Sequence, residues 1–167
     1  MEIREMFLPE FDTEMKKTRA TLERVPEGKQ DFKPHEKSMA LGKLAAHVAQ
    51  LPEFAVMIAE LPELDFSKSS MKPLVMDSRQ QLLDAFDVNI AKARAEIAKV
   101  SDEDWQKQWK LSFQGHTIVD APRFLMYRDM FLNHIIHHRA QLGVYLRLNN
   151  VPLPATYGPS ADDTMGF

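Results

Sequence analysis

Hydrophobic side chains recur at steps of three and four residues along most of this chain, which is the spacing of one buried face of an α-helix. The pattern predicts four long helices, at roughly residues 2–24, 38–61, 77–100 and 120–150. The stretches between them show no sustained alternation of apolar and polar residues of the kind that forms strands. The sequence therefore predicts an all-α fold, an antiparallel four-helix bundle.

The second predicted helix contains a proline. It begins near Ser38, a good N-cap residue, and its apolar series continues on both sides of Pro52. Proline lacks a backbone N–H and clashes with the preceding helical turn. We therefore expect this helix to kink or restart near Gln50, just after His47.

Three other stretches interrupt the helical pattern. The segment LPELDFSKSSMKPLVM (residues 61–76) is long for a hairpin connection and predicts a crossover or a partly wrapped loop between the second and third helices. Residues 101–120 predict a short helical turn and then irregular or weakly extended chain around Gln114 and Gly115. The tail from residue 149 onward is broken by prolines. It predicts an ordinary packed loop, with a pocket wall or a dimer contact as the alternatives.

Length and composition limit the classes of protein to which the chain can belong. Its 167 residues predict a single domain spanning residues 1–167. It has 21 basic and 24 acidic side chains, for a formal charge of -3, and lacks the basic stripe of a nucleic-acid-binding protein. The absence of cysteine excludes disulfides and thiolate metal sites. No secretory leader or membrane span is recognisable, so we expect a cytoplasmic protein without membrane or nucleic-acid partners.

The predicted fourth helix carries two histidines on the same face. His134 and His138 lie four residues apart, so both imidazoles project from the helix about one turn apart and can reach a single divalent cation. They belong to an unbroken apolar and aromatic series that we expect to face the bundle interior. Its members are Phe124, Tyr127, Phe131, His134, His138, Gln141, Tyr145 and Leu148.

His47 occupies a similar inward-facing position on the second predicted helix. A buried imidazole costs free energy unless its nitrogens have partners, and a metal ion is one such partner. Three imidazoles from two helices would leave coordination positions open, as catalytic metal sites do. We therefore predict a metal site formed by His47, His134 and His138. The alternative is a set of ordinary histidines with hydrogen bonds in the core.

Other chemically active side chains are predicted to have ordinary roles. His35 and His116 lie in irregular segments and are expected to be exposed. His137 falls one position off the inward face, where it would point to solvent, approach a neighbouring helix or support a metal ligand. Glu14 is expected to be a solvated carboxylate rather than a ligand or base. Arg139 is expected to form a surface ion pair rather than to steer an anionic substrate.

Two segments, FKPHEKSMALGKLAAHVAQLPEF and NHIIHHRAQLGVYLRLNNVPLPATYGPSADD, resemble the DinB/YfiT-like superfamily of metal-dependent four-helix-bundle proteins, and the resemblance extends over nearly the whole chain. It implies a divalent metal, commonly nickel or zinc. In that superfamily the ligands are a histidine on the second helix and an H-x-x-x-H pair on the last, matched here by His47, His134 and His138. The resemblance also implies up-down-down-up helices and a homodimer. Relatives include S-transferases that use a low-molecular-weight thiol.

These observations lead to three hypotheses about function. The first is a divalent-metal-dependent transferase that joins a low-molecular-weight thiol, as co-substrate, to an electrophilic small molecule. The second is a metal-dependent hydrolase, which would need a nearby base. The third is a non-catalytic, metal-stabilised binding protein connected with stress. The sequence does not identify catalytic residues, the substrate, the native metal or the thiol.

Overall fold

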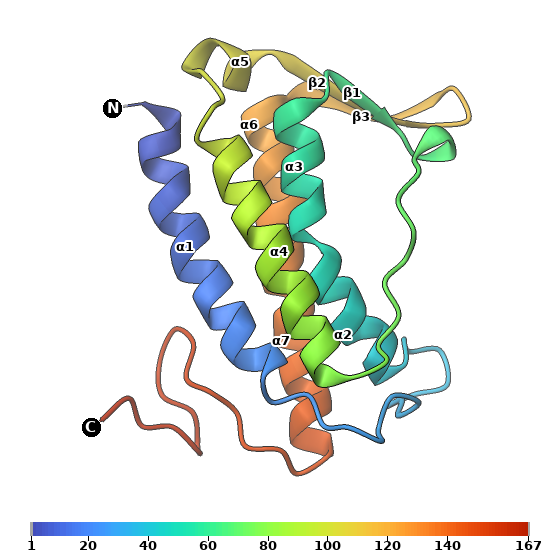
Figure 1. Cartoon of the computed structure of the whole chain (residues 1–167), viewed down its shortest axis with the longest axis vertical. Helices are drawn as coiled ribbons and strands as arrows, with labels where there is room; N and C mark the ends of the chain where they lie inside the picture. The colour runs from blue at the N-terminus through green and yellow to red at the C-terminus, as the bar shows by residue number, and fades with distance from the viewer. Residues whose placement is uncertain (1, 167) are drawn as a thin grey trace.

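The computed structural model describes residues 2–166 and is mostly helical. Four helical rods lie side by side and enclose the hydrophobic core (Figure 1). All four helical stretches predicted from the hydrophobic pattern are present, with ends that differ by a few residues. The rods are α1 (Ile3–Leu22), α2 (Leu41–Gln50) followed by α3 (Pro52–Glu60), α4 (Arg79–Ile97), and a continuous run of α6 (Arg123–Met126), η2 (Tyr127–Asn133) and α7 (His134–Leu148).

The second rod is divided where its proline predicted. Pro52 is the first residue of α3, where its missing N–H is tolerated, and Leu51 joins the two helices with a helical backbone. His47 therefore lies in the last turn of α2, one turn before the break. The kink or restart expected near Gln50 is confirmed.

The connection from α3 to α4 is a crossover. The chain leaves the upper end of α3 and runs down the outside of the molecule as an extended loop before entering α4 at the lower end, so α3 and α4 run parallel (Figure 1). Gln50 anchors this loop to α2: its amide nitrogen donates to the Lys72 carbonyl at 2.7 Å, and its amide oxygen accepts from the Leu74 N–H at 3.0 Å. The long link predicted between the second and third helices is thus present.

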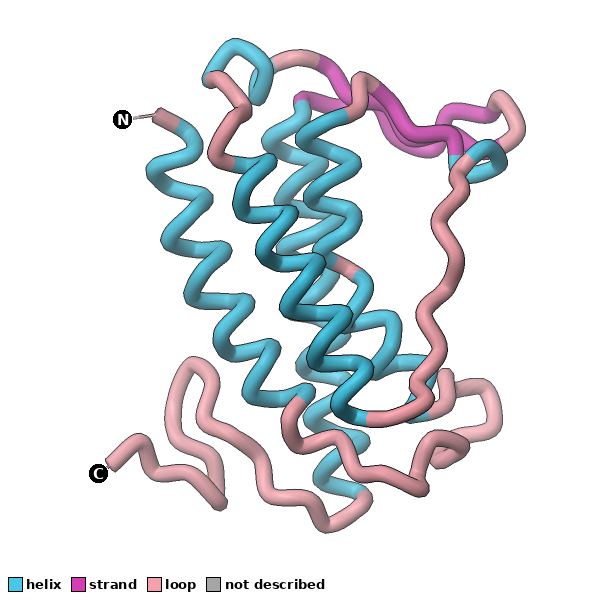
Figure 2. The backbone as a smooth tube through the Cα atoms, viewed as in Figure 1, coloured by secondary structure: helices cyan, strands magenta, loops and turns pink. Residues whose placement is uncertain are grey.

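The expectation of a purely α-helical chain is met only in part, because a small sheet covers one end of the helices (Figure 2). Strand β2 (Gln108–Phe113) lies in the middle, parallel to β1 (Glu63–Asp65) and antiparallel to β3 (His116–Pro122). Two short helices, η1 (Phe66–Lys68) and α5 (Asp102–Gln106), flank the strands. The helical turn predicted after residue 101 is α5. The last rod begins at Arg123 rather than near Asp120, because residues 116–122 pair as a strand.

The hairpin between β2 and β3 follows from local sequence. Gln114 and Gly115 form its two-residue turn and both have positive φ, the backbone geometry that matches the twist of paired strands. Trp109 and Leu111 alternate with more exposed residues on β2 and are buried against the helices. The indole N–H of Trp109 donates to the Leu61 carbonyl at 3.0 Å, which ties the sheet to the end of α3.

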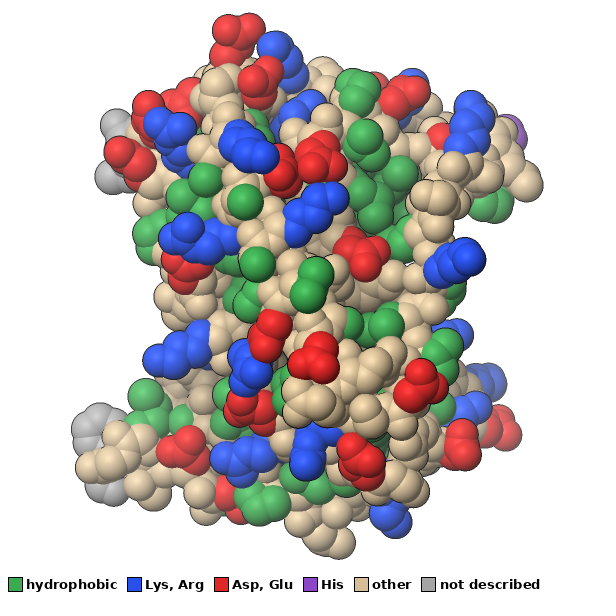
Figure 3. All heavy atoms as spheres, viewed as in Figure 1, with side chains coloured by type: hydrophobic (Ala, Val, Ile, Leu, Met, Phe, Trp, Pro, Cys, Tyr) green, Lys and Arg blue, Asp and Glu red, His purple; other side chains and the backbone are tan. Residues whose placement is uncertain are grey.

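The core is one continuous cluster of buried side chains from the helices and the sheet. Near the sheet it is aromatic: the ring of Phe7 stacks on Tyr127 with centroids 4.5 Å apart and meets Trp105 edge-on at 5.1 Å. On the face shown in Figure 3, acidic and basic side chains are interspersed rather than separated by sign. Among residues 2–166, no helix combines the length and the apolar character needed to cross a membrane.

Candidate metal centre

The three histidines predicted as ligands lie together. His47 comes from α2, and His134 and His138 come from the first two turns of α7, which packs against α2. The His47 ring centroid is 5.2 Å from that of His134 and 4.7 Å from that of His138, and the latter two are 4.7 Å apart. One ring nitrogen from each residue lies within 4.8 Å of the other two. All three rings are half-buried, so the cluster lies at the edge of the core.

A π-helical segment sets the direction in which these rings point. In Tyr127–Asn133 each turn takes up one more residue than in an α-helix, so the buried face moves by one position along the sequence. The continuous inward series expected from Phe124 to Leu148 is therefore only partly correct in its second half, where Tyr145 is buried. After the π segment the deepest positions are Ile135, Arg139, Leu142 and Leu146, whereas Gln141 and Leu148 are exposed. His134 and His138 lie beside this face.

Hydrogen bonds orient two of the rings. Nδ1 of His138 lies 2.7 Å from Oε1 of Gln141, and Nδ1 of His134 lies 3.3 Å from the carbonyl oxygen of Met130. Both partners are oxygens that only accept, which assigns the proton of each neutral ring to Nδ1 and leaves the Nε2 lone pair free. This is the arrangement of a metal-binding histidine, whose second nitrogen is held by an acceptor.

The surroundings also keep the rings uncharged. Burial, followed by the neighbouring His138 and His134, lowers the pKa of His47 to about 4. Burial is also the main cause that lowers the pKa values of His134 and His138. Desolvation disfavours the protonated form of an imidazole, so the rings are neutral at neutral pH. Neutral imidazole is the form that binds a metal ion.

The spacing of one pair of nitrogens fits a divalent cation. Two nitrogens at the usual 2.0–2.1 Å from a tetrahedral zinc ion are separated by about 3.4 Å. Nε2 of His47 and Nε2 of His134 are 3.4 Å apart. Within residues 2–166, no carboxylate joins the three imidazoles in this cluster. The donor set thus consists of three nitrogens, which leaves room for further ligands on the exposed side.

The remaining histidines lie outside the cluster. His35, His116 and His137 are all exposed, as the sequence predicted for the first two. The His137 ring is 4.9 Å from that of His138, but no hydrogen bond joins them. His137 is therefore a natural control for experiments on the three clustered histidines.

Glu14 and Arg139 do not behave as the sequence predicted. The expectations of a solvated carboxylate and a surface ion pair are both wrong, since Glu14 is 5% and Arg139 is 4% exposed. The Arg139 guanidinium lies 2.7 Å from Oε2 of Glu14, and the Tyr157 hydroxyl donates to the same oxygen at 2.7 Å. The π segment turns Arg139 toward α1, and Tyr157 arrives from the tail, so this ion pair depends on contacts that local spacing does not encode.

Sequence reasoning also missed the residues that orient the rings. Gln141 belongs to the series predicted to face inward, and its position three residues after His138 is the helical spacing that allows the contact. The Met130 carbonyl lies in the π segment, four residues before His134. The pattern of side chains does not predict this contact, because its acceptor is a backbone carbonyl.

Comparisons with known proteins agree on the fold. A DinB-like protein from Bacillus cereus superposes with a TM-score of 0.70 at 21% identity, covering 93% of this chain and 98% of the other. A DinB-like protein from Bacillus subtilis gives a TM-score of 0.64 at 18% identity, covering 87% and 92%. The search of curated proteins finds no match. The model of the DinB family matches residues 3–165, which is nearly the full length, and the chain therefore belongs to the DinB family.

Proposed function

We propose that this protein is a divalent-metal-dependent enzyme that joins a low-molecular-weight thiol to an electrophilic small molecule. His47, His134 and His138 would hold the metal, for which we propose zinc or nickel, two of the cations that imidazole ligands suit. The observation that carries the proposal is the convergence of three neutral imidazoles from two helices, with ligand atoms within 4.8 Å of one another.

Each part of the chain has a defined task in this proposal. His47 supplies a nitrogen from the rigid end of α2, and the π segment presents His134 and His138 to it from α7. Gln141 and the Met130 carbonyl hold the two α7 rings with Nε2 directed away from their Nδ1 partners. Because the three rings are only half-buried, a small substrate can approach the centre from solvent.

The thiol must come from a second substrate, because the chain contains no cysteine. When bound, a divalent cation supplies the positive charge that lowers the pKa of a neighbouring thiol and favours the nucleophilic thiolate at neutral pH. A hydrolase would also need a base beside the centre. Within residues 2–166, no aspartate or glutamate joins the cluster, which favours the thiol reaction over hydrolysis.

Elemental analysis of the purified full chain tests the metal site. We expect about one divalent ion per chain in the wild type and in His137→Ala, and a large loss in His134→Ala and His138→Ala, because two imidazoles bind a cation much more weakly than three. His137→Ala is the matched control, since it removes an exposed histidine from the same helix. Equal metal content in the wild type and His134→Ala would refute the site.

Turnover assays of metal-loaded protein then test the reaction. We expect consumption of a chloro- or epoxy-electrophile only when a small thiol is present, and no consumption after treatment with EDTA. The new carbon–sulfur bond would form as chloride leaves, or as an epoxide carbon–oxygen bond breaks and the alkoxide takes a proton from water. Hydrolysis of an ester, amide or phosphoester without thiol would support the hydrolase instead. A third outcome is that metal raises the melting temperature while neither the electrophiles nor the hydrolase substrates are consumed. This result would support a non-catalytic binding protein.

A further inference from the structure

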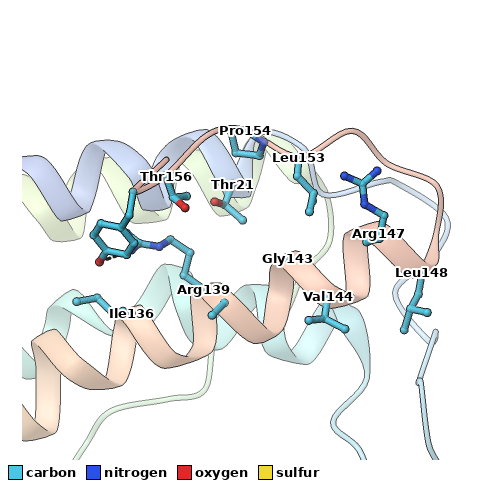
Figure 4. Close-up of a pocket in the computed structure, with 12 residues that line it drawn as sticks. Thr21, Ile136, Arg139, Gly143, Val144, Arg147, Leu148, Leu153, Pro154 and Thr156 are labelled. Carbon is cyan, nitrogen blue, oxygen red and sulfur yellow. Dashed lines mark hydrogen bonds between the residues drawn. The ribbon is translucent and has the colours of Figure 1, made fainter. Parts of the chain in front are cut away.

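A cavity of about 460 Å³ lies on the side of α7 that does not carry the histidine cluster. Its walls are α7, the end of α1 and the C-terminal tail, and Figure 4 shows Thr21, Arg139 and Leu153 reaching into the space between these segments. None of the three clustered histidines lines it. The cavity is therefore a separate feature of the molecule.

The cavity exists because small residues face a tail that is held at both ends. Gly143 and Ala140 leave the middle of the α7 wall almost bare, and a Cβ atom added at Gly143 would meet no atom within 4 Å. At one end of the cavity, Tyr157 is held by the buried Glu14–Arg139 pair. At the other end, Asp162 pairs with Arg147 and accepts from the Leu153 N–H at 2.9 Å.

The chemistry of the walls selects the kind of ligand. Ile136, Val144, Leu148, Leu153 and Pro154 provide an apolar lining, of which Val144 and Leu148 are 58% and 54% exposed to water. The two arginine side chains that line the cavity already form ion pairs, Arg139 with Glu14 and Arg147 with Asp162. A charged ligand would lose hydration there without gaining an unpaired counter-charge.

We propose that this cavity binds a neutral, predominantly apolar small molecule. Its volume falls within the range of small-molecule sites, and burial of an apolar ligand there would remove Val144 and Leu148 from water. The site does not depend on the metal centre. If no ligand binds in this cavity, the proposed thiol reaction at the metal centre is not affected.

Titration with the neutral dye N-phenyl-1-naphthylamine tests the proposal on the full chain. We expect saturable binding to the wild type and at least about tenfold weaker binding to Gly143→Leu, whose side chain would occupy the cavity. Ala95→Leu, at an exposed α4 position that does not line the cavity, is the matched control and should bind like the wild type. Ala140→Leu is a second blocking variant, and melting temperatures establish that each variant folds.

Three results would overturn the proposal. The first is equal dye binding by the wild type and both blocking variants. The second is equally tight, Gly143-sensitive binding of the sulfonated analogue 8-anilino-1-naphthalenesulfonate, which would contradict the charge argument. The third is a change of mass by light scattering, from dimer in the wild type to monomer in Gly143→Leu. This last result would assign the surface to a second copy of the chain.

Discussion

The amide oxygen of Gln141 accepts a hydrogen bond from Nδ1 of His138 at 2.7 Å, although the residue itself is exposed. Partners of this kind fix the tautomer and orientation of a ligating imidazole, and their loss typically costs 10- to 100-fold in metal affinity. We therefore expect Gln141→Leu to weaken metal binding by about that factor in a competition titration against a chelator. Gln141→Glu keeps an acceptor oxygen and should retain affinity. If Gln141→Leu bound metal like the wild type, this orienting role would be wrong.

Glu14 and Arg139 form an ion pair that is almost completely removed from water. Removal of Arg139 would leave the buried Glu14 carboxylate with only Lys17 and Tyr157 as partners, and breaking a buried ion pair typically costs 3–5 kcal/mol. We expect Arg139→Ala to lower the free energy of unfolding by about 3 kcal/mol or more in urea titrations. Arg94→Ala removes an exposed ion pair with Asp12 and is the control, with an expected loss below about 1 kcal/mol. Similar losses in both variants would contradict this view of the buried pair.

The same carboxylate makes stability depend on acid pH. Burial raises the pKa of Glu14, but hydrogen bonds from Tyr157, Lys17 and Arg139 outweigh burial and lower the pKa below its ordinary value of 4.5. The folded state therefore favours the ionised form. Its stabilisation is complete above the unfolded pKa and is lost as pH falls through the lower, folded pKa. We expect Glu14→Gln to show a smaller loss of unfolding free energy than the wild type between about pH 5 and pH 2. Parallel curves for the two proteins would rule out this contribution.

At the level of elements, the helices and the break at Pro52 were predictable, and the π segment was not. The three-four spacing located all four rods, and Pro52 located the break after His47. The same spacing predicted an inward face that continues through Tyr127–Asn133 as in a regular α-helix, but this segment is a π-helix. A π segment changes the hydrogen-bond pattern by one residue and leaves little trace in side-chain type. The burial of Arg139 was missed for that reason.

The β2–β3 hairpin depends on its turn. Gly115 has a φ of 81°, a conformation that is costly for residues with a Cβ atom. We expect Gly115→Ala to lower the free energy of unfolding by about 1 kcal/mol in denaturant titrations. Gly158→Ala is the control, because Gly158 lies in a loop without a positive φ and a Cβ there meets nothing within 4 Å. A larger effect at Gly158 than at Gly115 would show that the turn conformation is not the cause.

For the whole molecule, sequence reasoning was most successful where spacing along a single helix carries the information. It brought His134 and His138 together because four residues make about one turn, and it placed His47 opposite them from its inward position. It predicted the local β2–β3 hairpin only as irregular or weakly extended chain. It missed the β1–β2 pairing, because these strands are separated by more than forty residues and their pairing is decided by the tertiary fold. The contact between Glu14 and Tyr157 has the same long-range character.

We propose that the chain unfolds as one domain. Its buried side chains form one cluster that includes α1, α4, α7 and the sheet. Trp105 and Trp109 are buried at the sheet end, so their fluorescence reports on that end while far-UV circular dichroism reports on the helices. We expect the two signals to change with the same midpoint in urea. Separate midpoints would show that the sheet end and the helices unfold independently.

His47 and His134 are 87 residues apart in the chain, yet their Nε2 atoms lie 3.4 Å from each other. A cation shared between them would act as a reversible cross-link in a protein that has no cysteine from which to make a permanent one. In the entropy model used for disulfides, closing a loop of this length raises the free energy of the unfolded chain by about 4–5 kcal/mol. Such a cross-link contains no sulfur–sulfur bond to reduce, and it would open when the ion is withdrawn.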